Sequence, residues 1–420
     1  MFLSRLFSKQ PGGKVAFICA LLIWIASGPF YFWNAVKFLG IAYKIILFVV
    51  IGFIFMRNRS PIYYREAILP ILFFLSLLLY SCLPLFNGNS NIFGFISSLF
   101  AFFLFYIAFS NKFFIKNVFD IFSYLYAITV GISLISWVLM LLGVTPLLGI
   151  IDNITFDRYY YHYPFLIVEQ HDHVLIEESI RFAGHYDEPG LIGTFSAFIL
   201  YINRFNLKKP VNILCLISGI CSLSFFFAIV CLAYFVISFL FQNGAKFKKR
   251  NNTIKIVFVI LGLSVFTLYQ FTKDNDLIYG TFWSRFEYNK EEGKLSGVNR
   301  TTSEADKFYD NLTLDAFLFG GDAEQYKTVV GGSSSYKSVV VNNGAVFLLI
   351  YLLFFYLYAR KRCSLRSNLF FFLFFLLGNT YQRPDIYGLA VFFLYICLAN
   401  DISEEGKIMT ASHTQTSKNI

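Results

Sequence analysis

A ten-residue polar cassette, residues 181–190, carries the residue types most capable of chemistry in this 420-residue chain. It reads Arg-Phe-Ala-Gly-His-Tyr-Asp-Glu-Pro-Gly and lies between long apolar stretches. Ionisable groups beside hydrocarbon are costly and usually mark a functional site. An arginine can bind a phosphate through two parallel hydrogen bonds, and a carboxylate can act as a general base. The cassette therefore predicts phosphate recognition coupled to proton transfer.

The end of the cassette is typical of a helix start. Pro189 suits the first helical position, where its missing N–H costs nothing. Gly190 puts no side chain beside the free N–H groups, and a helix N-terminus attracts anions. We assign catalytic roles to Arg181, which would bind phosphate, and to Glu188, which would be a base or would orient an arginine. The substrate-binding candidates of the cassette are His185, Tyr186 and Gly190.

The same residues have a structural alternative. Asp187 or Glu188 could cap the helix that Pro189 opens, with Arg181 as the ion-pair partner of the acid. A lone interfacial histidine such as His185 is more often a hydrogen-bonded structural group than a ligand. For the arginine and the glutamate the functional interpretation is favoured, because only 14% of the residues are charged.

Three further arginines do not follow the basic pattern of the hinges between apolar stretches. Arg285 lies in Phe-Trp-Ser-Arg-Phe, Arg300 in Gly-Val-Asn-Arg-Thr, and Arg383 in a very short turn between two apolar stretches. A diphosphate between two lipid-anchored substrates would need more than one guanidinium. Surface ion pairing is the alternative, and it is nearly as good for Arg300. We add Arg383 to the catalytic candidates. The added substrate-binding candidates are Arg285, Arg300, Tyr381 and Gln382.

Two patterns imitate metal sites without convincing spacing. Asp274-Asn-Asp276 favours a helix-ending turn, and Glu169-Gln-His-Asp-His173 favours a polar loop. The seven cysteines lie in apolar stretches or in one basic hinge, so they predict no disulfide framework. We expect no metal and no other cofactor.

The elements that must position these residues are apolar. Apolar residues make up 57% of the chain and aromatic residues 20%, and the mean hydropathy is +0.61. A membrane span needs roughly 20 apolar residues. About twelve stretches qualify. They are residues 15–33, 38–56, 67–86, 92–110, 119–142, 190–203, 210–222, 225–242, 254–271, 342–359, 367–379 and 386–400.

The charge distribution predicts the orientation. The net charge of +10 is concentrated in short basic hinges, for example around Arg57, Arg204, Lys248 and Arg360. The positive-inside rule places such hinges and both termini in the cytoplasm. The excess charge therefore reflects topology, and we expect no nucleic-acid partner.

This topology defines the domain organisation of an all-α polytopic membrane protein with about twelve transmembrane helices and two large extracytoplasmic loops. The parts are helices 1–5 in residues 1–142, the first large loop in 143–189, helices 6–9 in 190–271, the second large loop in 272–341, helices 10–12 in 342–400, and a cytoplasmic tail in 401–420. Gly219 and the Ser222-Leu-Ser224 break predict close helix packing or a chain reversal at the external surface.

Several short motifs between about residues 120 and 400 together resemble the O-antigen and capsule repeat-unit polymerases, the Wzy type. They are the cassette, the Ser222-Leu-Ser224 break, Phe319-Gly-Gly321, the helix entry Asn343-Gly344 and the closing Tyr-Gln-Arg-Pro turn. The resemblance implies a GT-C-like glycosyltransferase on the outer face of the bacterial inner membrane. Its donor and acceptor would be undecaprenyl-diphosphate-linked oligosaccharides, without nucleotide sugar or metal. Membrane lipid and a chain-length regulator protein are the further partners that we expect.

The expected reaction assigns a role to each catalytic candidate. Arg181 and Arg383, helped by Arg285 or Arg300, would stabilise the diphosphate leaving group as its charge develops. Glu188 would orient or deprotonate the acceptor hydroxyl. Two alternatives stay open, an O-antigen ligase and a lipid-linked oligosaccharide flippase. The ligase resemblance is weakened because the second large loop contains no histidine. A flippase needs ionisable residues at the middle of several spans, where Lys44 is the obvious one.

Overall fold

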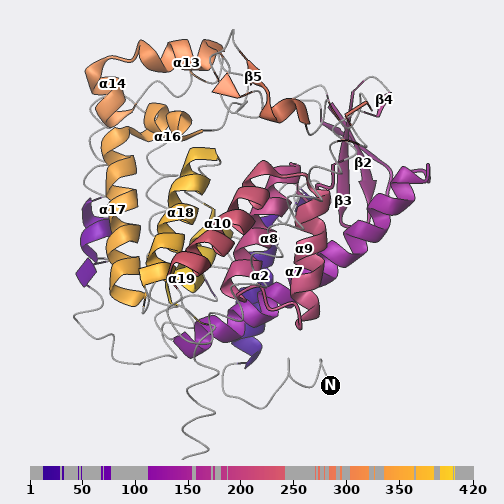
Figure 1. Ribbon diagram of the computed structural model, residues 1–420, viewed down its shortest axis with the longest axis horizontal. Helices are drawn as coiled ribbons and strands as arrows, with labels where there is room; N and C mark the ends of the chain where they lie inside the picture. The colour runs from indigo at the N-terminus through magenta and orange to yellow at the C-terminus, as the bar shows by residue number, and fades with distance from the viewer. Residues whose placement is uncertain are drawn as a thin grey trace, which may run out of the picture.

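The computed structural model shows a mostly helical protein with a small antiparallel sheet at one end of a helical bundle (Figure 1). It describes residues 13–28, 31–32, 46, 49, 68–69, 71–76, 112–153, 158–171, 174–175, 181–186, 188–241, 270, 273–274, 279, 283–289, 294–295, 303–320, 326, 335–363, 366–382, 388–400 and 402.

The described helices are α2 (Gly13–Ser27), α7 (Lys112–Leu141), α8 (Pro189–Ile202), α9 (Pro210–Cys221), α10 (Phe225–Phe241), α13 (Ser303–Asp310), α14 (Leu314–Phe319), α16 (Tyr336–Asn343), α17 (Ala345–Arg362), α18 (Arg366–Gln382) and α19 (Leu389–Ala399). A short 3-10 helix, η3, spans Trp283–Phe286. The strands are β1 (Ile150–Asn153), β2 (Arg158–Tyr163), β3 (Leu166–His171), β4 (Val174–Leu175), β5 (Tyr288–Asn289) and β6 (Lys294–Leu295).

Most predicted apolar stretches that fall on described residues form helices close to the expected bounds. Two helices begin at a proline, α8 at Pro189 and α9 at Pro210, as the missing N–H favours. Two predicted spans differ from the structure. The first ends early, at Ser27 before Gly28-Pro29, and the stretch 342–359 is broken at Gly344, where α16 and α17 meet at 117°. Gly344 has φ +87°, which favours glycine.

One described helix, α7, is long and apolar enough to cross a membrane. The bent pair α16 and α17 meets the same criterion only when its two helices are taken together. The remaining apolar helices described between residues 13 and 399 are shorter. The predicted spans 38–56, 67–86, 92–110 and 254–271 lie outside the described residues, apart from a few positions.

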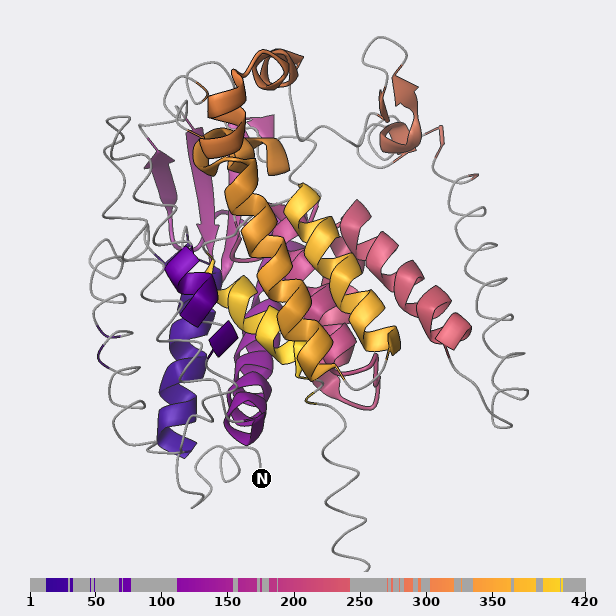
Figure 2. The same ribbon diagram turned by 90° about the vertical axis from the view of Figure 1, so that its left-hand side faces the viewer.

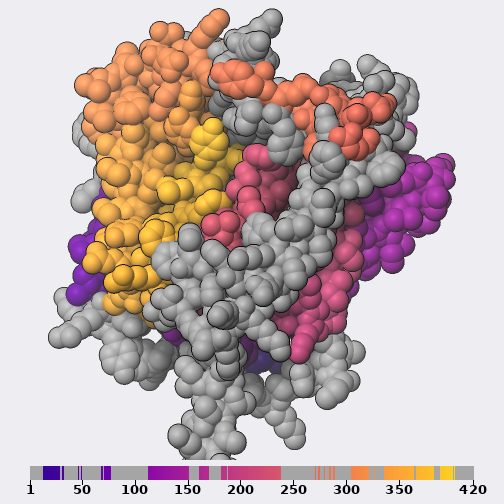
Figure 3. Space-filling model, viewed as in Figure 1, coloured from indigo at the N-terminus to yellow at the C-terminus, as the bar shows by residue number. Residues whose placement is uncertain are grey.

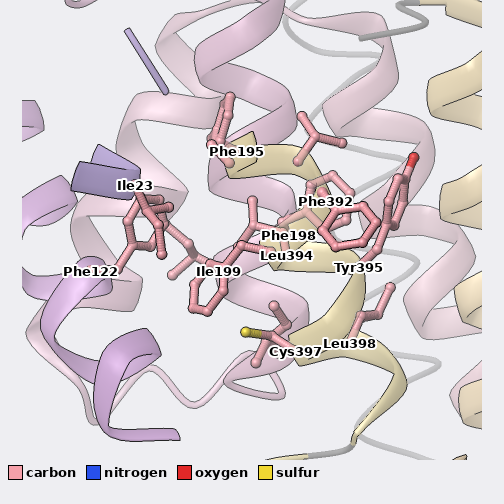
Figure 4. Packing of buried hydrophobic residues seen from close by; sticks show 14 of the residues in the cluster. Ile23, Phe122, Phe195, Phe198, Ile199, Phe392, Leu394, Tyr395, Cys397 and Leu398 are labelled. Atoms are coloured by element: carbon pink, nitrogen blue, oxygen red, sulfur yellow. The ribbon is translucent and has the colours of Figure 1, made fainter. Parts of the chain in front are cut away.

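One large apolar core holds the helices together. It joins α2, α7, α8, α9, α10, α17, α18 and α19. Figure 4 shows part of this core, with Phe122 of α7 beside Ile23 of α2, and Phe198 of α8 near Phe392 of α19. Phe122 and Phe198 are fully buried and Phe392 is 3% exposed. Burying each such ring contributes about 1.5–3 kcal/mol, so the core fixes the helix ends that carry the predicted site.

The sheet is the main difference from the all-α expectation. Strands β1 to β4 form an antiparallel meander in which Tyr161 pairs with Val168 and His162 with Ile167. The tyrosine-rich run in β2 has high strand propensity. The polar loop predicted over residues 169–173 is wrong for 169–171, because these residues complete β3. Positions 172–173 lie outside the described residues.

The described parts of the two predicted loops lie at the same end of the bundle. In Figures 1 and 2 the sheet, α13, α14 and α16 are gathered at the upper end, beyond the helix bundle. Helix α17 starts at this end and α18 returns to it. The connection between α8 and α9 lies at the opposite end. All described elements that carry candidate site residues therefore reach one end.

Candidate functional site

The cassette is held by four neighbouring elements. The Phe182 amide donates to the Cys221 carbonyl at the end of α9 (3.1 Å), and the Gly184 carbonyl accepts from the β3 amide of Ile167 (3.1 Å). Tyr186 Oη donates to Ser27 Oγ at the end of α2 (3.3 Å). Gly184 has φ +64°, and an added Cβ would lie 2.6 Å from Ile192 of α8. The cassette is therefore a fixed segment of the fold.

Arg181 lies against the turn between α9 and α10 and is 9% exposed. Its Nε donates to the Ser222 carbonyl over 3.2 Å. Because Nε is used, the side of the guanidinium that includes Nε is already engaged by the protein. The turn itself is tight, since Leu223 has φ +48° and a Cβ on Gly193 would lie 2.5 Å from Ser224 Cβ. The Ser-x-Ser break therefore reverses the chain and packs against α8.

Glu188 is the residue that precedes α8, with Pro189 in its first turn. Its backbone is extended, with φ −132° and ψ 135°, as a following proline requires. Its side chain makes no capping hydrogen bond to α8, so the capping alternative does not describe this glutamate. The residue is partly exposed. Asp187, the other capping candidate, lies outside the described residues.

His185 and Tyr186 are buried inside the cassette, at 0% and 1% exposure. The imidazole lies among the rings of Trp24, Phe32, Tyr126 and Tyr186, with centroids 4.2 to 6.4 Å away. Neither ring nitrogen has a hydrogen-bond partner within the described part of the chain. Burial lowers the pKa of His185 to about 3, so the ring is neutral at physiological pH.

Gly28 makes room for this histidine. A Cβ on Gly28 would lie 2.4 Å from His185 Cδ2 and 3.1 Å from Nε2. The interpretation of His185 as a hydrogen-bonded structural group does not match its unpaired nitrogens. Because His185 is buried, we interpret it as a residue that positions the cassette. Direct substrate binding by His185 and Tyr186 stays a prediction.

A continuous set of contacts leads from the cassette to the end of α18. Arg181 bonds to Ser222, and Phe226 follows at the start of α10. The Phe226 ring would lie 2.8 Å from a Cβ on Gly378 of α18. Helix α18 ends four residues later, at Gln382. The cassette thus contacts the turn before α10, and α18 packs against the start of α10, while the closing turn after Gln382 lies outside the described residues.

The remaining candidates are placed less completely. Tyr381 is 50% exposed and Gln382 ends α18. Gly190 is buried, and its carbonyl accepts from Thr194 Oγ1 at 2.8 Å. Arg285 belongs to η3, but its side chain lies outside the described part, as do Arg300 and Arg383 altogether.

Two groups of residues near the candidate site were not predicted from the sequence. Ser133 Oγ and Trp137 Nε1 of α7 are buried beside the cassette without a hydrogen-bond partner in the described structure. Their spacing of four places them on one helix face, but a serine and a tryptophan on an apolar helix give no distinct sequence signal. The second group surrounds Tyr336 and contacts the candidate Tyr381. Its members come from three helices, so no local pattern reveals it.

Two of the motifs that carry the family resemblance, Phe319-Gly-Gly321 and Asn343-Gly344, contact each other at Gly320. A Cβ on Gly320, which has φ +74°, would lie 2.8 Å from the Asn342 carbonyl oxygen and 2.9 Å from the Asn343 carbonyl carbon. Glycine is therefore required where α14 ends against α16. The two motifs belong to one packing contact, which supports α16 at the bend before α17.

The comparisons with known proteins add no relative. No family model matches the chain, and no curated protein or solved structure matches it. Within the described residues no cluster of His, Cys, Asp and Glu has the arrangement of a metal site. The functional interpretation therefore depends on the residues and contacts above.

Proposed function

We propose that this chain is an integral membrane glycosyltransferase that joins undecaprenyl-diphosphate-linked oligosaccharide repeat units on the outer face of the bacterial inner membrane. The product would be O-antigen, capsule or exopolysaccharide. The proposed architecture is GT-C-like, with about twelve spans and two large extracytoplasmic loops. The observation that carries the proposal is the buried Arg181 held on the α9–α10 turn, in the same short cassette as the partly exposed Glu188 at the start of α8.

Exposed apolar side chains support a membrane location. Along α7, Ile128, Ile135 and Val138 are 52%, 64% and 48% exposed and lie on one face of the helix. Helix α9 adds Ile217 and Ile220, at 42% and 58%. Apolar surface of this kind on an apolar helix fits contact with lipid. At 1.5 Å per residue, α7 is about 45 Å long, which exceeds the hydrocarbon thickness and fits a tilted or projecting helix.

The proposed reaction uses these residues in defined roles. A hydroxyl oxygen of the acceptor repeat forms a bond to the anomeric carbon of the donor chain. The bond between that carbon and the diphosphate oxygen breaks, and the diphosphate leaves with the electron pair. Glu188 accepts the hydroxyl proton. Arg181 and Arg383 stabilise the leaving group by their positive charge, and the N-terminus of α8 adds a favourable field.

The distribution of ionisable groups favours an enzyme over a flippase. The partly buried carboxyl of Asp120 in α7 interacts electrostatically with Lys116 and Lys209, which belong to the end of the bundle opposite the cassette. It therefore does not provide a charged group halfway along a transport path, as a flippase would need. The cassette residues lie together at the other end, as a one-sided active site requires.

Two experiments test the proposal. In a strain that lacks the gene, gels of surface polysaccharide should show single-repeat chains and regain long chains when the wild-type gene is supplied. Full-length chains left on the lipid carrier would indicate a ligase, and lipid-linked repeats facing the cytoplasm would indicate a flippase. In the second experiment the purified protein in lipid nanodiscs receives only lipid-diphosphate-linked repeats. A ladder of polymer should form, and its absence would contradict the proposed activity.

A further inference from the structure

A cluster of three tyrosines, one of them half-exposed, lies at the same end of the bundle, outside the cassette. Tyr336 at the start of α16 stacks with Tyr381 of α18, with ring centroids 5.9 Å apart and planes at 21°. Tyr309 of α13 meets Tyr336 edge-on at 6.2 Å. Figure 3 shows α13, α14 and the end of α18 adjoining on one face of the molecule. We call Tyr309, Tyr336 and Tyr381 the tyrosine cluster.

An ion pair between Lys337 and Asp306 supports the Tyr309 ring of the cluster. Lys337 Nζ lies 2.8 Å from Asp306 Oδ1 and 4.9 Å from the centroid of the Tyr309 ring. Desolvation alone would lower the pKa of Lys337, but its hydrogen bond to Asp306 raises the pKa above its usual value. Lys337 therefore stays protonated and bound to Asp306, and it fixes Tyr309 by a cation–π contact.

The exposed ring of the cluster is Tyr381. It is 50% exposed, whereas Tyr309 and Tyr336 are each partly buried. Tyr336 covers one face of the Tyr381 ring and holds its orientation. Within the described structure half of Tyr381 is exposed, so the ring presents surface to a ligand. A rigid ring with an apolar face and a polar tip suits a partner that is apolar on one side and hydroxylated at its rim.

The charges of the described residues around the cluster disfavour a phosphate on the tyrosine rings. Asp310 follows Tyr309 directly, Glu304 and the base Lys307 belong to the same helix α13, Asp315 belongs to α14, and Lys337 is bound to Asp306. An anion would meet repulsion from these carboxylates. A pyranose without charge avoids that repulsion, and its face of axial C–H groups matches an aromatic ring.

We infer that the tyrosine cluster is a subsite for one uncharged pyranose ring of the lipid-linked oligosaccharide, with Tyr381 as the stacking surface and Tyr336 as the positioning residue behind it. The inference rests on the proposed function, because it assumes an oligosaccharide substrate. Position supports it: Tyr381 precedes Gln382 and Arg383 at the end of α18, and α18 packs on α10 beside the cassette. A substrate with its diphosphate at the arginines would thus carry its sugars toward the cluster.

Direct binding tests the subsite without requiring catalysis. The probe is the single-repeat oligosaccharide, released from its lipid by mild acid and dephosphorylated, titrated into the full-length protein in detergent. Tyr381→Ala should weaken binding by about tenfold or more, because the stacking surface is lost. Tyr381→Phe keeps the ring and should bind within about threefold of wild type. Tyr288→Ala, which removes a 61% exposed tyrosine outside the cluster, is the matched control and should bind normally.

The positioning role of Tyr336 has its own control. Tyr336→Ala should weaken binding, and Tyr336→Phe should restore it, since the stacked ring returns. Thermal unfolding of each variant separates a lost subsite from a lost fold. Equal affinity of wild type and both alanine variants, or no binding by wild type, would overturn the subsite. If polymer forms normally in such variants, the proposed function stands without the subsite. Tyrosine-dependent oligosaccharide binding without any polymer would instead leave the subsite and refute the polymerase.

Discussion

The cassette and the tyrosine cluster lie at one end of the molecule and differ in almost every physical property. In the cassette, Arg181 and His185 are buried, and the neighbouring α9–α10 turn is under backbone strain at Leu223. In the cluster, Tyr381 is half-exposed, the other two rings are partly buried, and the surrounding described charges are mainly acidic. A buried cation interacts strongly with a developing negative charge, while an exposed ring adapts to different sugar faces. The difference indicates separate tasks, reaction in the cassette and recognition in the cluster.

The division predicts different consequences of substitution. Changes in the cassette should lower the rate for every substrate, because they alter groups at the reacting bond. Changes in the cluster should alter affinity and sugar preference and leave the chemical step nearly intact. Substitutions of Glu188 and Arg181 test whether the cassette carries out the reaction. Substitutions of Gly28 and His185 test whether the cassette is buried around an uncharged histidine.

Glu188→Gln should have the largest effect. Its side chain makes no capping bond in the structure, so a glutamine should cost the fold little. Loss of a general base should lower the rate of polymer formation by about 100-fold or more. The rate is measured with lipid-linked repeats in nanodiscs, and Asp187→Asn is the control that should retain activity. An active Glu188→Gln with an inactive Asp187→Asn would transfer the chemistry to the other carboxylate.

Arg181→Lys should have the second-largest effect. Lysine keeps the charge but cannot both donate to the Ser222 carbonyl as Nε does and present two further parallel N–H groups. We expect a loss of about tenfold to 100-fold in polymer formation, with a normal protein level in the membrane. Arg204→Lys, at an exposed arginine at the other end of α8, is the matched control. Wild-type chain length in Arg181→Lys would remove this arginine from the active site.

Gly28→Ala tests how the first helix supports the cassette. The added methyl would lie 2.4 Å from His185 Cδ2, so α2 or the cassette must move. Overpacking of this kind costs about 1–3 kcal/mol, seen as a lower unfolding temperature in detergent. His185→Ala removes the colliding ring, so the double variant should be more stable than the sum of the two single effects predicts. Additive effects would show that the two residues are not coupled.

The sequence predicted those features that depend on local residue types. Pro189 and Pro210 mark helix starts because proline fits the first turn, and the Ser222-Leu-Ser224 break ends one helix before the next. Contacts between distant residues gave no such signal. Nothing near Gly28 indicates that its missing side chain admits His185, and nothing near Tyr336 indicates Tyr381. These contacts depend on how the core packs the helices together.

Two elements were missed for identifiable reasons. Residues 158–163 alternate too weakly in polarity to indicate a strand, since tyrosine serves on either face of a sheet. The helix entry Asn343-Gly344 was named from the sequence and α17 begins directly after it, but helix α16 before it, at 117° to α17, was not expected. Hydropathy averages over Gly344, whereas its backbone conformation, with φ +87°, turns the chain.

The smallest predicted effect concerns pH and the neutral state of His185. The pKa of His185 is lowered to about 3 by burial, below its value in the unfolded chain. Between about pH 3 and pH 6.5 the unfolded chain therefore binds more protons, and stability falls as the pH falls. From pH 7 to pH 6 the loss attributable to this group is below about 1 kcal/mol. His185→Phe removes both unpaired nitrogens and should flatten the decline of the unfolding temperature over this range.

His162, whose pKa burial also lowers, remains in the variant and should leave a residual slope. An unchanged slope in His185→Phe would mean that the imidazole gains a proton or a partner in the folded protein, and the cassette would then not be the dry, neutral setting that distinguishes it from the tyrosine cluster.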